Sequence, residues 1–352
     1  MTDVYYGGIE GGATHSNLII CDKNGVIVAS VPGPSTNHWM VGIAECANRI
    51  AKMVEVGKCE GKIHQSVKLK TLGLSLSGCE QESSNNALER ELLYNHPDVS
   101  ESYVVCSDTL GSVFTASPKG GLVLIAGTGS NAMLSNPDGK TYNCGGWGNM
   151  LADEGSAWWI SHKGVKTVFD HMDGLNISPY PIDTVWELIK LHFSVDSRAD
   201  LLDHCYAKFQ KSVFAGLCVR LANAADEGDE LSKYLFREAG RQLAKATLAL
   251  TPKVCPTLVK SGDLNIVCVG SVWKSWHLLK EGFLSEIANG SFNFGLVLLR
   301  LTQQMALGAV YIGVDAKKHN MPREYSKNYE VFHYYQKKSL CNNNNNNHSN
   351  HI

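Results

Sequence analysis

The sequence predicts an α/β protein of two domains, each built around a mixed β-sheet flanked by helices. Three observations carry this prediction. The chain has 352 residues, whereas a single domain averages roughly 150. Short apolar segments alternate with amphipathic ones, and the first of them form hairpins, which indicates a mixed sheet. A strand–turn–strand unit near the N-terminus also recurs in the middle of the chain.

The composition predicts a cytoplasmic globular protein. Hydrophobic residues make up 44% of the chain and charged residues 19%. The formal net charge of −2 provides no basic surface for nucleic acid or for an acidic membrane. Residues 1–8 lack the features of a signal peptide, and no apolar run approaches the ~18 residues of a membrane span. The eleven cysteines include no C-x-x-C pair, which indicates reduced thiols without zinc or an iron–sulfur cluster.

The first part of the chain alternates strands and helices. Strands are expected at 4–9, 17–21, 26–31, 69–76 and 102–108. The turn DKNG, with its Asn-Gly pair, joins the second and third of these strands as a hairpin. Apolar residues recur at helical spacing after Asn37, and a more polar helix is expected at 85–94.

The second part opens with LVLIAGTGSN, residues 122–131, an apolar strand that stops in a turn of small residues. Asp153 and Glu154 are expected in the first turn of a helix that carries Trp158 and Val168 inward. Residues 230–250 form an amphipathic helix, and NIVCVGSVWKSW reads as strand, Gly-Ser turn and helix start. The Asn-rich tail at 341–352 has almost nothing apolar to bury and is predicted to be disordered.

The small-residue turn repeats the N-terminal one. Thr14 matches Thr128 at an offset of 128 − 14 = 114 positions, and three further pairs match at the same offset. These pairs are Ser16 with Ser130, Asn17 with Asn131, and Gly25 with Gly139. Turns use such residues in any case, so two unrelated hairpins remain an alternative.

The chemistry of these turns suits phosphate. Glycine lets backbone N–H groups approach closely, and Ser or Thr adds a hydroxyl donor. GGATHS, GTGSN and the later Val269-Gly270-Ser271 all have this character. Neither GxxxxGK[ST] nor a dinucleotide-binding G-x-G-x-x-G is present. The duplicated hairpin unit therefore predicts a nucleotide held between two lobes.

Three side chains have two interpretations each. Asp108 follows a strand, where it could accept the proton of a sugar hydroxyl, but the residues alone favour a helix cap. Asn37 could likewise be a cap or a sugar ligand. Trp147 could be a core aromatic, although the glycines on both sides of it argue against a buried strand or helix.

The chain resembles the eukaryotic N-acetyl-D-glucosamine kinases, within the superfamily of sugar kinases, heat-shock ATPases and actin. The resemblance rests on GGIEGGATHS, STNHW, LGLSLSG, SESYVVCSD, LIAGTGSN, CGGWGNMLADEGSAWWI, FAGLC and CVGSVWKSW. Of these, CGGWG followed by DEGSAWW is the most specific. Two positions depart from the pattern: Ala13 replaces an expected third glycine, and Glu10 stands where many relatives carry Asp.

The resemblance implies ATP-dependent phosphorylation of N-acetylglucosamine at its 6-hydroxyl, with Mg²⁺ bound through ATP and Glu10 near it. It implies that Asp108 is the catalytic base. The sugar would be bound by Asn37, Asp108, Ser130, Asn131, Gly146, Trp147, Gly148 and Asp153. ATP would be bound by Thr14, Thr128, Ala215 and Ser271.

The resemblance further implies an actin-like ATPase fold with duplicated ribonuclease-H-like domains, and a homodimer. Residues 1–117 would form the small domain and 118–326 the large one, with a helix near 327–340 that packs back on the small domain. The alternatives are a kinase of N-acetylmannosamine or glucose, and a non-catalytic interaction protein that retains the fold. An activator of iron–sulfur enzymes would need clustered cysteines, and a chaperone would need an extra peptide-binding domain.

Overall fold

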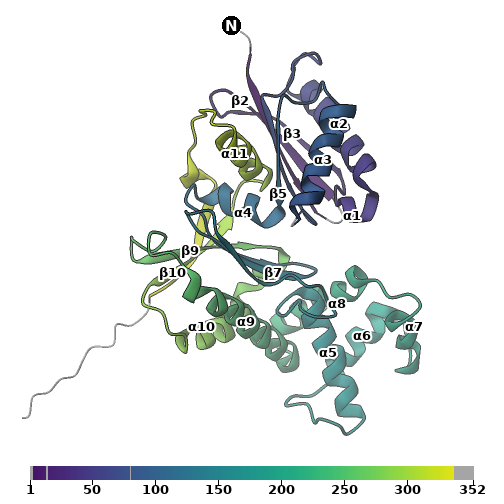
Figure 1. Ribbon diagram of the computed structural model, residues 1–352. Helices are drawn as coiled ribbons and strands as arrows, with labels where there is room; N and C mark the ends of the chain where they lie inside the picture. The colour runs from purple at the N-terminus through teal and green to yellow at the C-terminus, as the bar shows by residue number, and fades with distance from the viewer. Residues whose placement is uncertain (1–2, 13–14, 80, 337–352) are drawn as a thin grey trace, which may run out of the picture.

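The structure is a computed structural model that describes residues 3–12, 15–79 and 81–336. It has a small and a large domain, each with its own mixed sheet (Figure 1). Thr14, Ala13 and the Asn-rich tail, about which the sequence makes predictions, lie outside the described residues.

The small domain is a five-stranded sheet of order β3-β2-β1-β4-β5. Its strands are β1 (Tyr5–Gly11), β2 (His15–Asp22), β3 (Ile27–Pro34), β4 (Thr71–Leu76) and β5 (Tyr103–Ser107). Strands β1, β4 and β5 are parallel, whereas β2 pairs antiparallel with both β1 and β3. One face packs against α2 (Ile43–Glu60) and α3 (Glu82–Asn95), and the other against α11 (Ala306–Ala316). Short α1 (His38–Val41) precedes α2.

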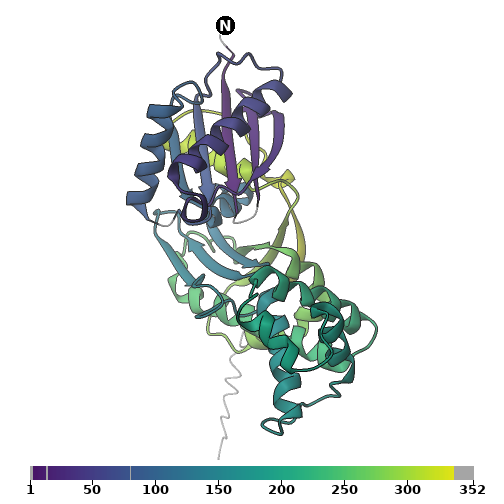
Figure 2. The same ribbon diagram turned by 90° about the vertical axis from the view of Figure 1, so that its right-hand side faces the viewer.

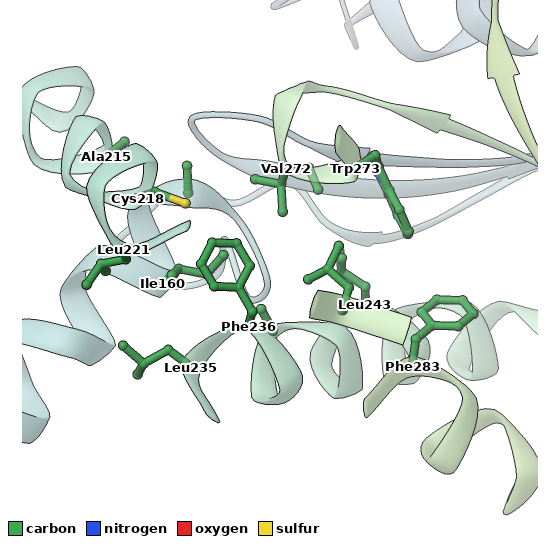
Figure 3. Packing of buried hydrophobic residues seen from close by; sticks show 14 of the residues in the cluster. Ile160, Ala215, Cys218, Leu221, Leu235, Phe236, Leu243, Val272, Trp273 and Phe283 are labelled. Atoms are coloured by element: carbon green, nitrogen blue, oxygen red, sulfur yellow. The ribbon is translucent and has the colours of Figure 1, made fainter. Parts of the chain in front are cut away.

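The large domain is a six-stranded sheet of order β11-β10-β9-β6-β7-β8. Its strands are β6 (Gly121–Ala126), β7 (Ser130–Ser135), β8 (Thr141–Gly145), β9 (Asp263–Val269), β10 (Gly295–Leu301) and β11 (Tyr329–Tyr335). One face packs against α5 (Ala157–Met172), α8 (Lys211–Asp226), α9 (Glu230–Leu250) and α10 (Trp276–Ala288). Figure 3 shows part of this core, in which Trp273 and Phe283 lie between the sheet and the helices.

The other face of the large sheet packs against α4 (Asp108–Ala116), the helix that follows the last strand of the small sheet. Val113 and Ala116 of α4 are buried against Val123, Met133 and Val267 of the large sheet. Helix α4 therefore lies between the two domains, where Figures 1 and 2 also place it.

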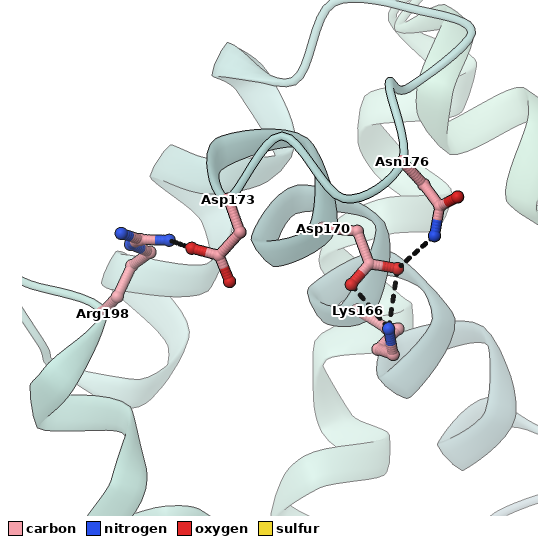
Figure 4. Close-up of polar contacts among 5 residues, drawn as sticks. All are labelled: Lys166, Asp170, Asp173, Asn176 and Arg198. Atoms are coloured by element: carbon pink, nitrogen blue, oxygen red, sulfur yellow. Dashed lines mark hydrogen bonds and ion pairs between the residues drawn. The ribbon is translucent and has the colours of Figure 1, made fainter.

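The helices α5, α6 (Asp183–Phe193), α7 (Leu202–Cys205) and α8 extend to one side of the large domain (Figure 1). Polar contacts hold the end of α5 there (Figure 4). Asp170 pairs with Lys166 at 2.5 Å and accepts a hydrogen bond from Asn176 at 3.3 Å, and Arg198 pairs with Asp173. These pairs are at the surface, so each contributes little to the free energy of unfolding.

The internal repeat is confirmed by the order of the strands, although the two hairpin registers differ by one residue. Gly11 of β1 pairs with Ser16, whereas Ile125, which lies 114 positions after Gly11, pairs with Asn131. The turns after β2 and β7 also match, because Gly25 and Gly139 have φ values of 80° and 83°. Strand order 3-2-1-4-5 recurs as 8-7-6-9-10. The sheets are thus two copies of one unit, with β11 added to the second.

The prediction of a C-terminal helix near 327–340 is wrong. Residues Tyr329–Tyr335 form β11, which pairs antiparallel with β10 of the large sheet. The segment YEVFHYY is rich in aromatic residues and contains a β-branched one, and such residues favour a pleated, half-buried strand. The helix that packs on the small sheet is α11, which precedes β11 in the chain and lies within the range 118–326 that was predicted to belong to the large domain.

Glycines allow α11 to lie close to the small sheet. A Cβ added at Gly73 of β4 would lie 1.8 Å from the carbonyl oxygen of Ala309, and one at Gly8 of β1 would lie 2.3 Å from that of Ala306. Any larger residue at these two positions would push the helix away. The small sheet and α11 therefore form one unit although they are far apart in sequence.

Candidate functional site

The candidate site lies where the carboxyl ends of parallel strands from both sheets meet. Strands β1, β4 and β5 end at one edge of the small sheet, and β6, β9 and β10 end at one edge of the large sheet. In α/β proteins, ligands bind beyond the carboxyl ends of strands. The small-residue turns predicted from sequence all follow these strand ends.

Two of these turns are in direct contact. Gly270, which follows β9, has a φ of 107°, and a Cβ there would lie 2.3 Å from the carbonyl oxygen of Ala126 and 2.8 Å from the amide nitrogen of Gly127. Ser271, the next residue, is exposed and begins the short helix η3 (Ser271–Ser275). Trp273 in this helix is 2% exposed and donates from Nε1 to the carbonyl oxygen of Leu124 at 3.1 Å, which fixes the turn on the sheet.

The first residues of helix α5 form hydrogen bonds with the turn after β6. The amide of Ala157 donates to the carbonyl oxygen of Gly127 at 2.9 Å, and that of Trp158 donates to Thr128 at 3.2 Å. Thr128 itself is exposed. Among the described residues, the amides of Thr128 and Gly129 have no hydrogen-bond acceptor. These donors are available to a phosphate group.

Asp108 is the first residue of α4, directly after β5. Ser107, and not Asp108, is the N-cap residue of this helix, so the cap interpretation of Asp108 does not hold at that position. The hydroxyl of Ser107 donates to Oδ1 of Asp108 at 3.4 Å. A carboxylate in the first turn is also stabilised in its charged form by the helix dipole. Asp108 is half-buried at the junction of the two domains.

Contacts of the neighbouring residue place Asp108 near β7. The hydroxyl of Thr109 donates to the sulfur of Met133 at 3.1 Å. Because side chains alternate along a strand, Asn131 lies on the same face of β7 as Met133, two residues closer to the strand's start. Asn131 thus shares the interdomain face of the large sheet with the start of α4.

Asn131 faces the glycine loop after β8. Its Oδ1 is buried and has no partner among the described residues. A Cβ at Gly146 would lie 2.8 Å from that oxygen, so the loop passes directly over the amide. Gly146 and Gly148 have φ values of 80° and 76°, and Trp147 between them is 72% exposed. The core interpretation of Trp147 is therefore wrong.

Ser130 and Asp153 form the other side of this loop. The amide of Ser130 donates to Oδ1 of Asp153 at 2.9 Å, and the hydroxyl of Ser130 donates to the carbonyl oxygen of Glu154 at 2.9 Å. Asp153 is 3% exposed and has a φ of 76°, so it is not in the helix that was predicted to start there. That helix, α5, begins at Ala157 after the N-cap Ser156.

Asn37 caps a helix, as one of its two interpretations predicts. Its Oδ1 accepts a hydrogen bond from the amide of Trp39 at 3.0 Å at the start of α1. This leaves the Nδ2 group of Asn37, which has no partner among the described residues, as a donor. A role as a sugar ligand is compatible with the cap and stays a prediction.

Ala215 is the predicted nucleotide residue that the structure places deepest. It lies in α8, is 5% exposed, and its carbonyl oxygen accepts a hydrogen bond from Ser161 at 3.4 Å. Cys144, in the motif CGGWG, lines a cavity of about 300 Å³ between β7, β8 and α9. Burial raises the pKa of the Cys144 thiol, which opposes a role as a nucleophile.

A cleft of about 440 Å³ lies between the two domains, beside the Gly270 turn. Glu10 lies at its small-domain side, where the side-chain Nδ2 of Asn17 donates to the carboxylate of Glu10 at 3.3 Å. Burial raises the pKa of Glu10. The sequence prediction missed three polar residues of this cleft, because they belong to no turn motif: Arg300, Gln303 and Gln304.

Glu10 is a suitable protein ligand for Mg²⁺ bound together with ATP. No group of three or more His, Cys, Asp or Glu residues able to hold a metal occurs in the described ranges. Mg²⁺ commonly binds one or two carboxylates together with substrate phosphates and waters. The single half-buried carboxylate of Glu10, in a cleft with the Gly270 turn, is a donor set of this kind. In the same ranges, no helix has the length and apolar character needed to cross a bilayer.

Known proteins resemble this chain over most of its length. The model of the BadF/BadG/BcrA/BcrD ATPase family matches residues 8–291. The N-acetyl-D-glucosamine kinase of Dictyostelium discoideum is 24% identical over 329 residues, which cover 88% of this chain and 98% of that protein. The N-acetylmuramic acid/N-acetylglucosamine kinase of Clostridium acetobutylicum is 24% identical over 313 residues, 88% of this chain and 97% of that protein.

The fold is also found among solved structures. A protein of Chromobacterium violaceum, provisionally assigned as an N-acetylglucosamine kinase, superposes with a TM-score of 0.69 at 20% identity. The superposition covers 88% of this chain and 98% of that protein. The predicted fold of two mixed sheets flanked by helices is confirmed.

Proposed function

The chain belongs to the BadF/BadG/BcrA/BcrD ATPase family, and we propose that it transfers the γ-phosphoryl group of ATP to the 6-hydroxyl of N-acetyl-D-glucosamine. Its homologues are named N-acetylglucosamine kinases and related sugar kinases. A location in the cytoplasm and assembly as a homodimer belong to the same proposal and rest on the family resemblance.

One observation carries the proposal: a single turn borders both the nucleotide side and the sugar side of the site. Ala126 and Gly127, at the start of this turn, touch the Gly270 turn on one side. Ser130, directly after the turn, is bonded to Asp153 and Glu154 on the other. A phosphate on the amides of Thr128 and Gly129 would therefore lie next to a sugar held at Asn131 and the Gly146–Gly148 loop.

In the proposed reaction, the oxygen of the 6-hydroxyl attacks the γ-phosphorus. A new phosphorus–oxygen bond forms as the bond to the β–γ bridging oxygen breaks, and ADP leaves. Asp108 accepts the proton of the attacking hydroxyl. Bound at Glu10 and the phosphates, Mg²⁺ would offset their negative charge.

The residues of this chain orient the reactants. Gly146, Trp147 and Gly148 present backbone and an exposed indole to the sugar ring, while Asn37 and Asn131 supply amide groups. Thr128 and Ser271 supply hydroxyl donors for the phosphates, and Ala215 belongs to the helix beside the nucleotide. Closure of the domains would exclude water, which competes with the sugar for the phosphoryl group.

The substrate assignment is tested by ADP formation across a sugar panel. N-acetylglucosamine should support a kcat/KM at least about tenfold higher than N-acetylmannosamine or glucose, because a site built for an N-acetyl group leaves polar groups unpaired when the group is absent or displaced. The reaction should require added Mg²⁺. Faster turnover of glucose or N-acetylmannosamine would identify the related hexose kinase instead, and no turnover of any sugar would favour the non-catalytic alternative.

A further inference from the structure

Lys211 lies against the turn at residues 127–129, although no sequence motif of that turn includes it. Its Nζ is 2.6 Å from Oδ2 of Asp153. The side chain of Asp153 is 3% exposed and that of Lys211 is 32% exposed. Among the ion pairs of the described residues, no other carboxylate is so deeply buried. Burial makes the partner important, because a carboxylate left without its cation in such a place is costly.

The Lys211–Asp153 ion pair lies directly against the backbone of Gly129. A Cβ at Gly129 would lie 2.6 Å from Oδ1 of Asp153 and 2.9 Å from Nζ of Lys211. The same Oδ1 accepts the amide hydrogen of Ser130 at 2.9 Å. Asp153 is therefore held at both oxygens, by a hydrogen bond at Oδ1 and by the ion pair at Oδ2. A carboxylate can accept about four hydrogen bonds, which leaves acceptor capacity for sugar hydroxyls.

Lys211 also connects this turn to the nucleotide side. It is the first residue of α8, and Ala215 lies four residues later. Residues at this spacing share one face of a helix. The face of α8 that bears Ala215 thus also carries the cation that holds Asp153.

We propose that Lys211 is a positioning residue for the sugar: acting through Asp153, it holds the carboxylate and Ser130 in the geometry that binds the sugar hydroxyls. The inference rests on the proposed function, since it concerns the sugar position of that site. It adds a residue of α8 that neither the turn motifs nor the glycine loop contains.

The test compares Lys211→Met, Lys211→Arg, Asp153→Asn and the double variant Lys211→Met/Asp153→Asn with the unmodified protein. Lys211→Met should raise the KM for N-acetylglucosamine about 10- to 100-fold, because displacement of binding groups by about 1 Å costs up to ~10²-fold. The KM for ATP should change less than about threefold. Lys211→Arg should restore most of the sugar affinity. Lys208→Met is the matched control, since Lys208 pairs with Asp203 at 2.6 Å on the exposed surface three residues earlier, and it should leave both constants unchanged.

The double variant decides how Lys211 acts. If it acts through Asp153, the double variant has the same sugar KM as Asp153→Asn alone, because the second substitution removes nothing further. Multiplied effects, or a rise in the ATP KM with an unchanged sugar KM, would overturn the proposal and assign Lys211 to the phosphates. An unchanged sugar KM in Lys211→Met would overturn it as well.

Failure of the proposed function has a separate signature. If the unmodified protein phosphorylates no sugar, the substrate assignment fails whatever the variants do. Thermal unfolding of the unmodified protein, Lys211→Met, Asp153→Asn and the double variant then tests the positioning of the turn without any substrate. Non-additive shifts in Tm support the coupling of Lys211 to Asp153, and additive shifts overturn it.

Discussion

Replacing Asp108 by Asn should lower kcat by about 10²–10⁴-fold, or roughly 3–5 kcal/mol of barrier. Asn keeps the shape of the side chain but cannot accept the proton of the attacking hydroxyl. The KM for ATP should stay close to that of the unmodified protein, because the turns at Thr128 and Gly270 are untouched. Steady-state kinetics with N-acetylglucosamine and ATP measure both quantities.

Asp183→Asn is the control for this substitution. Asp183 is likewise the first residue of a helix, α6, but it lies in the helical part of the large domain. Both substitutions remove a charge that a helix dipole stabilises, an effect of about 0.3–1 kcal/mol on stability. If Asp108 served only its helix, the two variants would show equal small losses in Tm and a kcat within threefold of the parent, which would refute the role as base.

Gly270→Ala should lower kcat/KM for ATP by about 10²-fold, since a shift of the phosphate turns of about 1 Å would have that effect. The added Cβ would lie 2.3 Å from the carbonyl oxygen of Ala126. Both atoms belong to backbone or are fixed to it, so no rotamer change relieves the contact and the two turns must separate. The backbone at Gly270, with φ 107° and ψ 160°, lies in a region that essentially only glycine adopts, which adds a strain of about 1–3 kcal/mol.

Gly262→Ala separates these two effects. Gly262 has a φ of 98°, but a Cβ there would meet no atom within 4 Å. This variant should therefore show the backbone strain, as a lower Tm, with kinetics like those of the parent. Equal kinetics for Gly262→Ala and Gly270→Ala would show that the contact between the turns does not matter for ATP.

The repeated unit could be predicted from sequence because its signals are local. A hairpin turn needs glycine at a positive φ, and Gly25 and Gly139 provide it at matching positions. Small residues after an apolar strand mark the turn at a sheet edge, and such a turn follows both β1 and β6. The registers of the two hairpins differ by one residue, which the matched positions do not predict. The candidate site residues Thr128, Ser130 and Ser271 could be predicted because they lie within such turns.

Other parts of the site could not be predicted because they depend on contacts between distant segments. Lys211 lies far along the chain from Gly129, and no local pattern distinguishes it from a solvated lysine such as Lys208. The contact between Gly270 and Ala126 follows from the pairing of β6 with β9. The family resemblance predicts a helix at the C-terminal segment, whereas Tyr329–Tyr335 form a strand that pairs with β10.

The most direct test of the account is identification of the phosphorylated product. The protein is incubated with ATP, Mg²⁺ and N-acetylglucosamine, and parallel reactions contain the 6-deoxy sugar, which lacks the attacking hydroxyl. NMR spectroscopy of phosphorus and carbon should show ADP and a phosphate monoester on C6, formed only from the complete sugar. A phosphate ester at another position, or release of inorganic phosphate at the same rate with both sugars, would contradict the account.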